Sequence, residues 1–493
     1  MSLPGWVLPY KEPKTEIKCI NGHFYKYAVE YRYNSAKKRT DKVSVKLLGR
    51  LSETDGFIPS SKQSSTDNQV DLRKVDIKTF GVFGLFQSLL GEEIHGILSL
   101  FKREVSEILL IVALCRFAHQ SAIKRMPHYH STDYSSEHWS KGGINAKNIS
   151  QALGKVGENR EVIVAWMQKR IASPPASLSN FLMIDSTHIP TVSENLNINS
   201  AGYNPLSSFD KQIRLMYIFS SELKQPVYYR LINGNIADIS SMKTCVEELN
   251  VKPVVFIADK GFYSKNNTSA LRENKMHFII PLRRDNKLID YTFFQNRDFK
   301  KSAKYFFTYQ NRIIWYYEYQ VENNFIITYL DDELRVREEK DFLNRCATHP
   351  EVYTLEKFEA KINTFGTLTL MYELPLKPTP EELYQTYKQR NEVEVMFDAY
   401  KHFLEADKTY MQDRHVFEGW LMANFIAMIA YYRLYAALKE AGKLSNTSPK
   451  DVVEFSKSVY KMRSGGMWIT TETTAKVRTL LNSLKIDYLN EQS

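Results

Sequence analysis

The stretch FLMIDS, residues 181–186, places four apolar side chains directly before Asp185. A second stretch, VVFIAD at residues 254–259, leads in the same way to Asp259. Short, continuous apolar runs of this kind indicate strands that are buried on both faces of a sheet. Acidic residues at the carboxyl ends of adjacent strands project into the crevice where α/β sheets bind ligands. The two stretches therefore predict an α/β core that brings Asp185 and Asp259 together.

The residues around these two stretches predict the other elements of the core. Strands are expected at residues 213–219, 227–232 and 277–280, and helices at residues 242–249 and 269–274. Three hairpin-connected strands, then a helix, a strand, a helix and a strand, follow one another in the order of an RNase H-like fold. We therefore expect an α/β protein whose RNase H-like core, built on a mixed sheet, begins with residues 176–285.

A third acidic residue, Glu394, lies on a helix whose start is well specified. Thr379 suits the N-cap, Pro380 suits the first helical position, and Glu382 can reach back to complete a capping box. Polar side chains then recur at offsets of 3, 7 and 14 residues, namely Tyr387, Arg390, Glu394 and Lys401. At about 100° per residue they fall within an arc of roughly 60°, so they are predicted to share one face. A surface helix with an Arg390–Glu394 ion pair would show the same spacing.

The three acids together indicate a site for two divalent metal ions. Each aspartate alone could belong to an ordinary turn, since Asp185-Ser186-Thr187 and Asp259-Lys260-Gly261 both suit one. Two carboxylates held close together repel each other, which raises the pKa of one of them. Two Mg²⁺ ions about 3.5 to 4 Å apart would remove that repulsion and stabilise the attacking and leaving oxygens of a displacement at phosphorus. The candidate catalytic and metal-binding residues are therefore Asp185, Asp259 and Glu394, with Mn²⁺ expected to substitute for Mg²⁺.

These motifs resemble those of the DDE transposases of bacterial insertion sequences. IDST around Asp185, ADKGFYS around Asp259 and the spacing Y-x2-R-x3-E-x6-K on the Glu394 helix are similar to the signature of the insertion-sequence-4 group and its close sister families. The segment GNIAD at residues 234–238 resembles another recurring family segment. The resemblance covers about residues 181–438 and implies a DNA transposase.

The resemblance also implies roles for the matched positions, beginning with the three acids as metal ligands. Tyr387, Arg390 and Lys401 would contact the phosphates and the distorted end of the transposon. Transposases of this group use such contacts when a DNA hairpin forms and a base is flipped out. Lys260 stands where family members often carry arginine, which keeps the charge but not the bidentate geometry toward a phosphate. Trp315 is a candidate platform for the flipped base. An ordinary strand aromatic fits Trp315 equally well.

Further regions are predicted before, within and after the core. Residues 1–74 should form a β-hairpin and a Ser-rich linker, and the hairpin turn Lys37-Lys38-Arg39 could contact phosphates or simply face water. Residues 75–175 show helical spacing and could either bind DNA ends through a helix-turn-helix or serve packing alone. The remaining predicted regions are a β-rich insertion at 286–378, the second part of the core at 379–440 and a helical region at 441–493.

The charge balance favours DNA as the partner. The chain has 66 Lys and Arg residues against 56 Asp and Glu residues, a net charge of +10, and its pI is near 9.0. Such a bias favours a polyanionic partner. Arg283 and Arg284, after the last strand of residues 176–285, are further candidates for DNA contacts. Because two element ends must be cut and joined together, we expect double-stranded terminal inverted repeats and target DNA as substrates, and at least a homodimer on DNA.

Other classes of protein are disfavoured. The four cysteines form no CxxC pair, which supports neither a disulfide framework nor a cysteine zinc site. The longest apolar stretch, residues 420–432, is shorter than the roughly 18 residues that a membrane span needs, and residues 1–14 lack the apolar core of a signal peptide. No G-x-x-x-x-G-K-[ST] loop occurs, so no nucleotide cofactor is expected. We expect a bacterial cytoplasmic protein that associates with the nucleoid when it binds DNA.

The expected reaction is cut-and-paste DNA transposition. A metal-activated water would cut one strand at the element's end, and the freed 3′-hydroxyl would attack a second phosphodiester, with a hairpin as one route. Two alternatives are an RNase H-like nuclease without strand transfer and a domesticated DNA-binding regulator. The presence of all three acids argues against the regulator.

Overall fold

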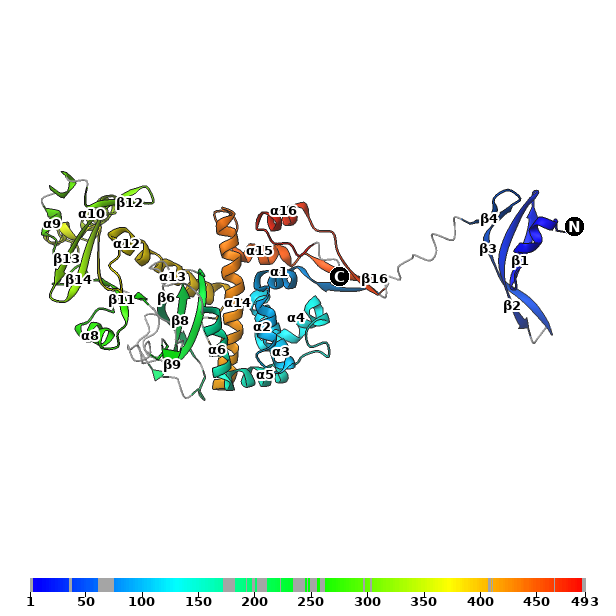
Figure 1. The fold of residues 1–493 in the computed structure, drawn as a ribbon, viewed down its shortest axis with the longest axis horizontal. Helices are drawn as coiled ribbons and strands as arrows, with labels where there is room; N and C mark the ends of the chain where they lie inside the picture. Colours follow the sequence, from blue (N-terminus) through cyan, green and yellow to red (C-terminus); the bar gives the residue numbers. More distant parts are fainter. Residues whose placement is uncertain are drawn as a thin grey trace. The chain divides into compact units, whose positions relative to one another are not determined.

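The computed structural model describes the 493-residue chain except for residues 1–2, 35–37, 61–74, 172–181, 192, 197–199, 202–210, 222, 234–243, 246, 249–254, 258–261, 296–297, 302–303, 407–408, 410, 465 and 490–493. The described part is a mixed α/β structure (Figure 1). It divides into two compact units. The first unit contains residues 1–77, 462–469 and 493, and the second contains residues 78–461 and 470–492.

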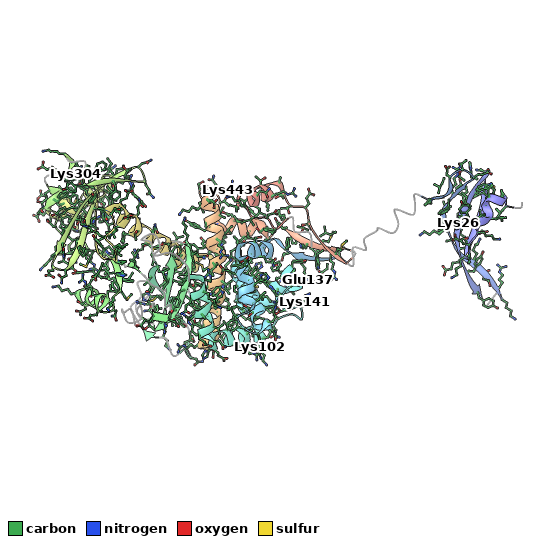
Figure 2. All side chains as sticks on the ribbon, viewed as in Figure 1. Lys26, Lys102, Glu137, Lys141, Lys304 and Lys443 are labelled. Atoms are coloured by element: carbon green, nitrogen blue, oxygen red, sulfur yellow. The ribbon has the colours of Figure 1, made fainter. Side chains whose placement is uncertain are left out.

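The first unit is an antiparallel sheet in the strand order β1-β2-β3-β4. Its elements are η1 (Gly5–Tyr10), β1 (Thr15–Ile20), β2 (His23–Asn34), β3 (Arg39–Ser52) and β4 (Gly56–Pro59). The helix η1 packs on one face, where Val7 is buried and Trp6 contacts Phe24 edge to face. Lys26, labelled in Figure 2, is 6% exposed and pairs with Glu12. The pairing of β2 with β3 confirms the predicted hairpin, whereas most of the predicted linker lies outside the described residues.

The second unit begins with the helices predicted for residues 75–175, and the short strand β5, which precedes them, starts two residues before this unit's first residue. These elements are β5 (Asp76–Thr79), α1 (Gly81–Leu90), α2 (Glu93–Leu98), α3 (Arg103–His119), η3 (Ile123–Arg125), α4 (Met126–Thr132), η4 (Tyr134–Glu137), α5 (Ala146–Glu158) and α6 (Arg160–Ile171). The long helix α14 (Arg414–Glu440) packs against α3 and α5. A Cβ on Gly157 would lie 2.0 Å from the carbonyl oxygen of His415, and one on Gly419 would lie 2.1 Å from that of Leu153. Glycine at both positions therefore lets the backbones of α5 and α14 touch.

The helix α14 is longer than the apolar stretch that the sequence shows at residues 420–432. It has 27 residues and, by length and composition alone, could cross a membrane. However, 72% of its most apolar 18-residue window is buried within the protein, and Leu421, Phe425 and Ile429 have no exposed surface. The core helix of a folded domain passes the same test of length and composition. The burial of α14 confirms the prediction of a buried helix, although the helix is twice as long as expected.

One sheet of the second unit contains the first predicted acid. Its strands are β6 (Leu182–Pro190), β7 (Ser200–Ala201), β8 (Lys211–Ser220) and β9 (Gln225–Asn233), with β6 and β9 both antiparallel to β8. The prediction that the first strand ends at Asp185 is wrong, because β6 continues to Pro190. All nine residues of β6 pair with β8, so the backbone ladder continues after the apolar side chains end.

A second sheet has the strand order β10-β11-β15-β14-β13-β12. Its strands are β10 (Val255–Ile257), β11 (His277–Leu282), β12 (Phe306–Tyr309), β13 (Arg312–Val321), β14 (Asn324–Asp331) and β15 (Thr367–Glu373). β10 is parallel to β11 and lies beside β6. The helix α8 (Lys265–Glu273) confirms the helix expected at residues 269–274, whereas much of the helix expected at 242–249 lies outside the described residues.

The strands of the predicted insertion, residues 286–378, continue the sheet of β10 and β11, because β15 pairs directly with β11. The same region also contains helical segments. These are α9 (Thr292–Gln295), η5 (Asp298–Lys301), α10 (Asp332–Thr348), α11 (Leu355–Lys361) and η6 (Ile362–Thr364). The boundaries of the predicted domains remain predictions.

The last part of the chain corrects two expectations. The single helix expected from Thr379 is divided into α12 (Pro380–Lys388), α13 (Arg390–Asp398) and the π-helical turn η7 (Ala399–Phe403). The region 441–493, predicted to be helical, contains α15 (Pro449–Ser456) and α16 (Ala475–Ser483) but also the strands β16 (Tyr460–Ser464) and β17 (Met467–Thr470). These strands form a three-stranded sheet in the order β17-β16-β5.

Candidate active site

The start of α12 is fixed by the capping box that the sequence predicts. The Thr379 hydroxyl accepts a hydrogen bond from the Glu382 backbone N–H at 3.2 Å, and the Glu382 carboxylate accepts one from the Thr379 backbone N–H at 2.8 Å. The hydrogen bonds that the Thr379 backbone N–H and hydroxyl donate to this carboxylate lower the pKa of Glu382. Pro380 occupies the first turn, where its missing N–H costs no hydrogen bond. The helical segment that leads to Glu394 therefore has a defined beginning.

The helix α13 and the turn η7 lie against the strand pair β6 and β8 (Figure 1). Asp185 of β6 is in register with Tyr217 of β8. The Tyr217 ring is fully buried and meets Phe397 of α13 and Tyr400 of η7 edge to face, at centroid distances of 6.0 and 5.8 Å. Burial raises the pKa of Tyr217 well above its ordinary value, so its hydroxyl stays protonated. This aromatic contact fixes α13 over the part of β6 that contains Asp185.

The strand β6, which contains Asp185, is a neighbour of α13, which contains Glu394, and of β10, which ends two residues before Asp259. Asp185 lies in the middle of β6, β10 runs beside β6, and α13 packs against β6. Asp259 follows the end of β10 by two residues, and Glu394 lies within α13. The side chain of Asp185, all of Asp259 and the segment at 234–238 lie outside the described part of the structure. Within the described part, no group of three or more His, Cys, Asp or Glu side chains is placed to hold a metal ion.

Glu394 presents an exposed carboxylate at the edge of α13. Its side chain is 57% exposed, and its Oε1 accepts a hydrogen bond at 2.9 Å from Arg390, whose side chain is only 15% exposed. This is the i,i+4 ion pair that the sequence allows. The guanidinium is thus held against the protein while the carboxylate faces outward, where it is open to a cation or to a phosphate-bound ion.

Lys401 contributes positive charge near the end of β6. His188 lies on β6 three residues after Asp185, and its Nε2 is 2.6 Å from the Arg214 guanidinium of β8. Burial lowers the pKa of His188, and the charges of Arg214 and Lys401 lower it further. A neutral imidazole can accept the hydrogen bond from Arg214 through Nε2. Lys401 and Arg214 therefore both place positive charge near His188, on the strand that contains Asp185.

No sequence pattern predicted a role for His188, Arg214 or Tyr217. One signal for Arg214 was present, since it is the lone charged side chain inside the apolar run 212–219, and a charge within a buried strand needs a partner. Its partner could not be named, because the pairing with His188 depends on the register between β6 and β8.

The predicted common face of Tyr387, Arg390, Glu394 and Lys401 is only partly formed. Tyr387 is 9% exposed, so its ring is mostly packed inside the protein, while Glu394 faces outward. The helix breaks at Gln389, and the π turn winds more residues into each turn, so the 100° spacing does not extend to Lys401. The prediction of one continuous helix that carries all four residues is therefore wrong, while α13 packs against β6 and the charge of Lys401 acts on His188 of that strand.

The remaining predicted DNA contacts are spread over the second unit. Arg283 is exposed after β11, whereas Arg284 pairs with Glu338 at 2.9 Å and donates to the Thr367 carbonyl oxygen. Lys260 lies outside the described residues. Trp315 is 9% exposed, and its indole N–H donates to Asp332 at 3.2 Å. The burial of the Trp315 ring agrees with the alternative interpretation of an ordinary aromatic residue in a strand. It gives no support to a platform for a flipped base.

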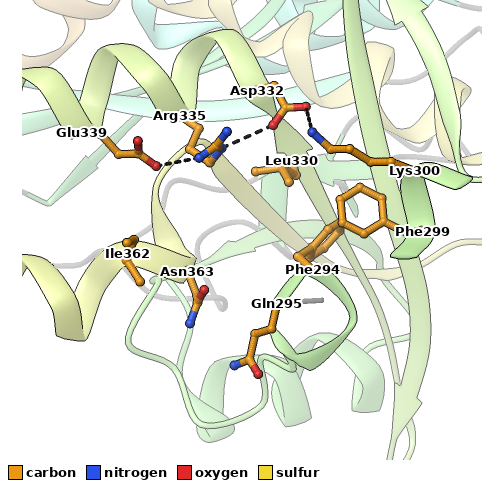
Figure 3. Close-up of a pocket in the computed structure, with 10 residues that line it drawn as sticks. All are labelled: Phe294, Gln295, Phe299, Lys300, Leu330, Asp332, Arg335, Glu339, Ile362 and Asn363. Atoms are coloured by element: carbon orange, nitrogen blue, oxygen red, sulfur yellow. Dashed lines mark hydrogen bonds and ion pairs between the residues drawn. The ribbon is translucent and has the colours of Figure 1, made fainter. Parts of the chain in front are cut away.

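A pocket of about 230 Å³ lies within residues 294–363 (Figure 3), and the ring of Phe299 in its lining meets Trp315 edge to face at 5.2 Å. Phe294 and Phe299 form part of its apolar wall. A chain of ion pairs crosses its rim, with Asp332 bound to Lys300 at 2.5 Å and to Arg335 at 3.3 Å. The predicted acids and cations of the site are absent from its lining, so the pocket is separate from the candidate active site.

Comparisons with known proteins agree with the motifs. The family model described as a transposase DDE domain matches residues 177–430. Among solved structures, a cryo-EM structure of the piggyBac transposase synaptic complex with hairpin DNA is similar to this chain, with 11% sequence identity, 76% of this chain and 79% of the other covered, and a TM-score of 0.37. No curated protein sequence matches the chain. Because the family model spans more than half of the 493 residues and includes Asp185, Asp259 and Glu394, the chain belongs to the transposases with a DDE domain.

Proposed function

We propose that this transposase cuts DNA at the terminal inverted repeats of a mobile element and joins the freed ends to target DNA. The observation that carries the proposal is the packing around β6, since β10 and α13 both lie against the strand that contains Asp185. Asp259 comes two residues after the end of β10 in the chain, and Glu394 lies within α13, which supports a shared site for the three acids. The membership in the insertion-sequence-4 group or a close sister family is part of the proposal.

An RNase H-like core is supported by the order of the strands. β8 pairs antiparallel with both β6 and β9, β10 lies beside β6, and β11 is parallel to β10. Three antiparallel strands are thus followed by two parallel strands with an intervening helix, α8. The first acid lies within β6, and the second follows the end of β10, the strand beside it, by two residues in the chain.

The donor set suits divalent magnesium or manganese. Asp185, Asp259 and Glu394 would supply carboxylate oxygens, the ligands that hard divalent cations prefer. Two bound ions would activate the attacking hydroxyl and stabilise the leaving oxygen at the scissile phosphate.

The protein's cations would hold the phosphate during this reaction. Arg390 is held against the protein by packing and by Glu394, so its guanidinium is ready to pair with a phosphate oxygen. Lys401 adds a second positive charge near the end of β6. The same residues would act in the first step, in which water is the nucleophile, and in the second step, in which a 3′-hydroxyl is the nucleophile. Attack by the 3′-hydroxyl on the opposite strand would form a hairpin intermediate.

The partners in this proposal are double-stranded terminal repeats, target DNA and a second copy of the chain. The net charge of +10 favours DNA, with an affinity that falls steeply as salt rises. Action on chromosomal DNA would place the protein in the bacterial cytoplasm, on the nucleoid.

The test is incubation of the purified chain with DNA that has the flanking inverted repeats, in Mg²⁺ and in EDTA. We expect nicked, hairpin and joined products in Mg²⁺ that Asp259→Ala abolishes. Hydrolysis without joined products would favour a nuclease that does not transpose. Cleavage unchanged by Asp259→Ala would contradict the site, and binding without cleavage under any metal would favour a domesticated regulator.

A further inference from the structure

The first 60 residues contain half of the chain's net positive charge. They include 11 Lys and Arg residues and 6 Asp and Glu residues, a net charge of 11 − 6 = +5, against +10 for all 493 residues. The described part of this segment folds as the sheet β1-β2-β3-β4 of the first unit. A small, strongly basic sheet suits a polyanionic partner.

Tyrosines follow one another along one face of this sheet. Side chains alternate along a strand, and the two register shifts of the β2–β3 pair skip residues of β3 only, so the odd-numbered residues of β2 share the face opposite Phe24 and its contact with η1. The buried Val29 lies between Tyr27 and Tyr31 on this face. Arg50 and Lys18 are in register with Tyr25, and Lys42 is in register with Tyr31. We call this surface the tyrosine face, defined by Tyr25, Tyr27, Tyr31, Tyr33, Lys18, Lys42 and Arg50.

The outer rings of the tyrosine face are open to solvent. Tyr31 is 55% exposed and Tyr33 is 64% exposed. They lie two residues apart on one strand, which separates them by about 6.6 Å. Two exposed rings beside each other form a contiguous aromatic surface, and a contiguous patch rather than a single exposed ring is what indicates binding.

Cations lie directly beside these rings. The Lys18 ammonium is 5.4 Å from the centroid of the Tyr27 ring, and the Lys42 ammonium is 5.9 Å from that of Tyr31. Lys42 also pairs with Glu16, and Arg50 contacts the His23 ring at 3.2 Å. Rings interleaved with cations can bind flat bases and the phosphates that join them at the same time.

We propose that the tyrosine face binds single-stranded DNA, with unpaired bases stacked on Tyr31 and Tyr33 and phosphates contacted by Arg50 and Lys18. In a duplex, each base is already stacked on its neighbours, so exposed rings on a flat sheet have no base face to bind. In a single strand, every base offers that face, whatever its sequence. The choice of DNA over RNA rests on the proposed function, whereas the stacking surface itself does not.

The binding test uses the full-length chain in EDTA, so that catalysis plays no part. Fluorescence anisotropy would measure affinity for labelled oligothymidine of about 20 nucleotides, longer than the roughly 4 to 16 nucleotides that one single-strand-binding fold covers. The same oligonucleotide paired with its complement, and oligouridine, are the comparison ligands. We expect the single strand of DNA to bind more tightly than the duplex to the tyrosine face.

Matched variants separate stacking from charge. Y31A/Y33A should weaken oligothymidine binding roughly tenfold or more, while Y31F/Y33F, which keeps both rings, should bind like the unmodified chain. Arg50→Ala should lower both affinity and its salt dependence more than Lys46→Ala does. Lys46 is exposed but in register with Ala28, on the opposite face.

Three outcomes would overturn the proposal. They are oligothymidine binding unchanged in Y31A/Y33A, an equal loss of duplex binding in that variant, and tighter binding of oligouridine than of oligothymidine. Thermal melting of each variant would show that the sheet remains folded. Because end cleavage in Mg²⁺ is measured separately, failure of the tyrosine face is distinguishable from failure of the active site.

Discussion

Two alanine substitutions on α5, three residues apart, should change stability in opposite directions. A Cβ on Gly157 would lie 2.0 Å from the His415 carbonyl oxygen, whereas one on Gly154 would meet its nearest atom, the Val416 Cγ2, at 3.7 Å. Cβ atoms essentially never approach other heavy atoms within 3.0 Å, so Gly157→Ala must separate the backbones of α5 and α14 by about 1 Å. Gly154→Ala needs no such movement.

The magnitudes follow from packing and helix propensity. Overpacking a close contact costs about 1 to 3 kcal/mol. Replacing a helical glycine by alanine gains about 0.5 to 1 kcal/mol where space allows. Gly157→Ala should therefore lose roughly 1 to 2 kcal/mol of unfolding free energy, and Gly154→Ala should gain about 0.5 to 1 kcal/mol.

The assay is urea unfolding followed by tryptophan fluorescence. Trp166 on α6 meets Phe425 of α14 at 6.2 Å, so its emission reports on the helices that the substitutions affect. A lower midpoint for Gly157→Ala and a higher one for Gly154→Ala, with unchanged slopes, would agree with the close approach. If both variants moved the midpoint in the same direction, or Gly157→Ala were as stable as the unmodified chain, the inferred contact between α5 and α14 would be wrong.

The remaining predictions concern the site and the histidines. Glu394→Gln should reduce end cleavage by about a hundredfold or more, while Asp398→Asn, an exposed carboxylate on the same helix, should have little effect in the same gel assay. Lys401→Met should raise the pKa of His188, as measured by NMR of labelled histidine, because it removes one of the charges that oppose protonation; an unchanged titration would place Lys401 away from β6. Burial lowers the pKa of His119 to about 4, so the unfolded chain, with a pKa near 6.5, binds the proton first. Stability should then fall as pH drops below about 6.5, and less so in His119→Gln, as urea midpoints at pH 7.5 and 5 would show.

Local chemistry made several elements predictable. The Thr379 capping box needs only residues three apart, and the structure shows both of its hydrogen bonds. The strands at residues 213–219, 227–232 and 277–280 correspond to β8, β9 and β11, because apolar and β-branched runs keep their preference within a sheet. The acids were predicted from motif and spacing, which are properties of the chain alone.

The pairing of strands that are far apart in the chain could not be predicted from the sequence. The register of β11 with β15, for example Phe278 with Glu373, joins residues far apart in the chain, and no local pattern shows that the strands of the insertion extend the same sheet. The π turn η7 contains no glycine or proline, so no residue type in the sequence predicts it. It accompanies the burial of both Tyr400 and Phe403, which pack against Tyr217 and Phe117, so tertiary contacts rather than local preference set the position of Lys401.

The Arg390–Glu394 ion pair fits a catalytic role better than a purely structural one. An i,i+4 pair on a helix contributes only about 0.3 to 0.5 kcal/mol, and the 57% exposed Glu394 carboxylate is well screened by water. The Arg390 side chain is nevertheless packed to 15% exposure, so a pair of this strength is not what keeps it in place. Under the proposed function, the weak bond to Glu394 is easily exchanged, so the carboxylate would turn to a divalent cation while the guanidinium turns to the phosphate that the cation holds. In a solution without DNA or metal, each residue then serves as the other's temporary partner.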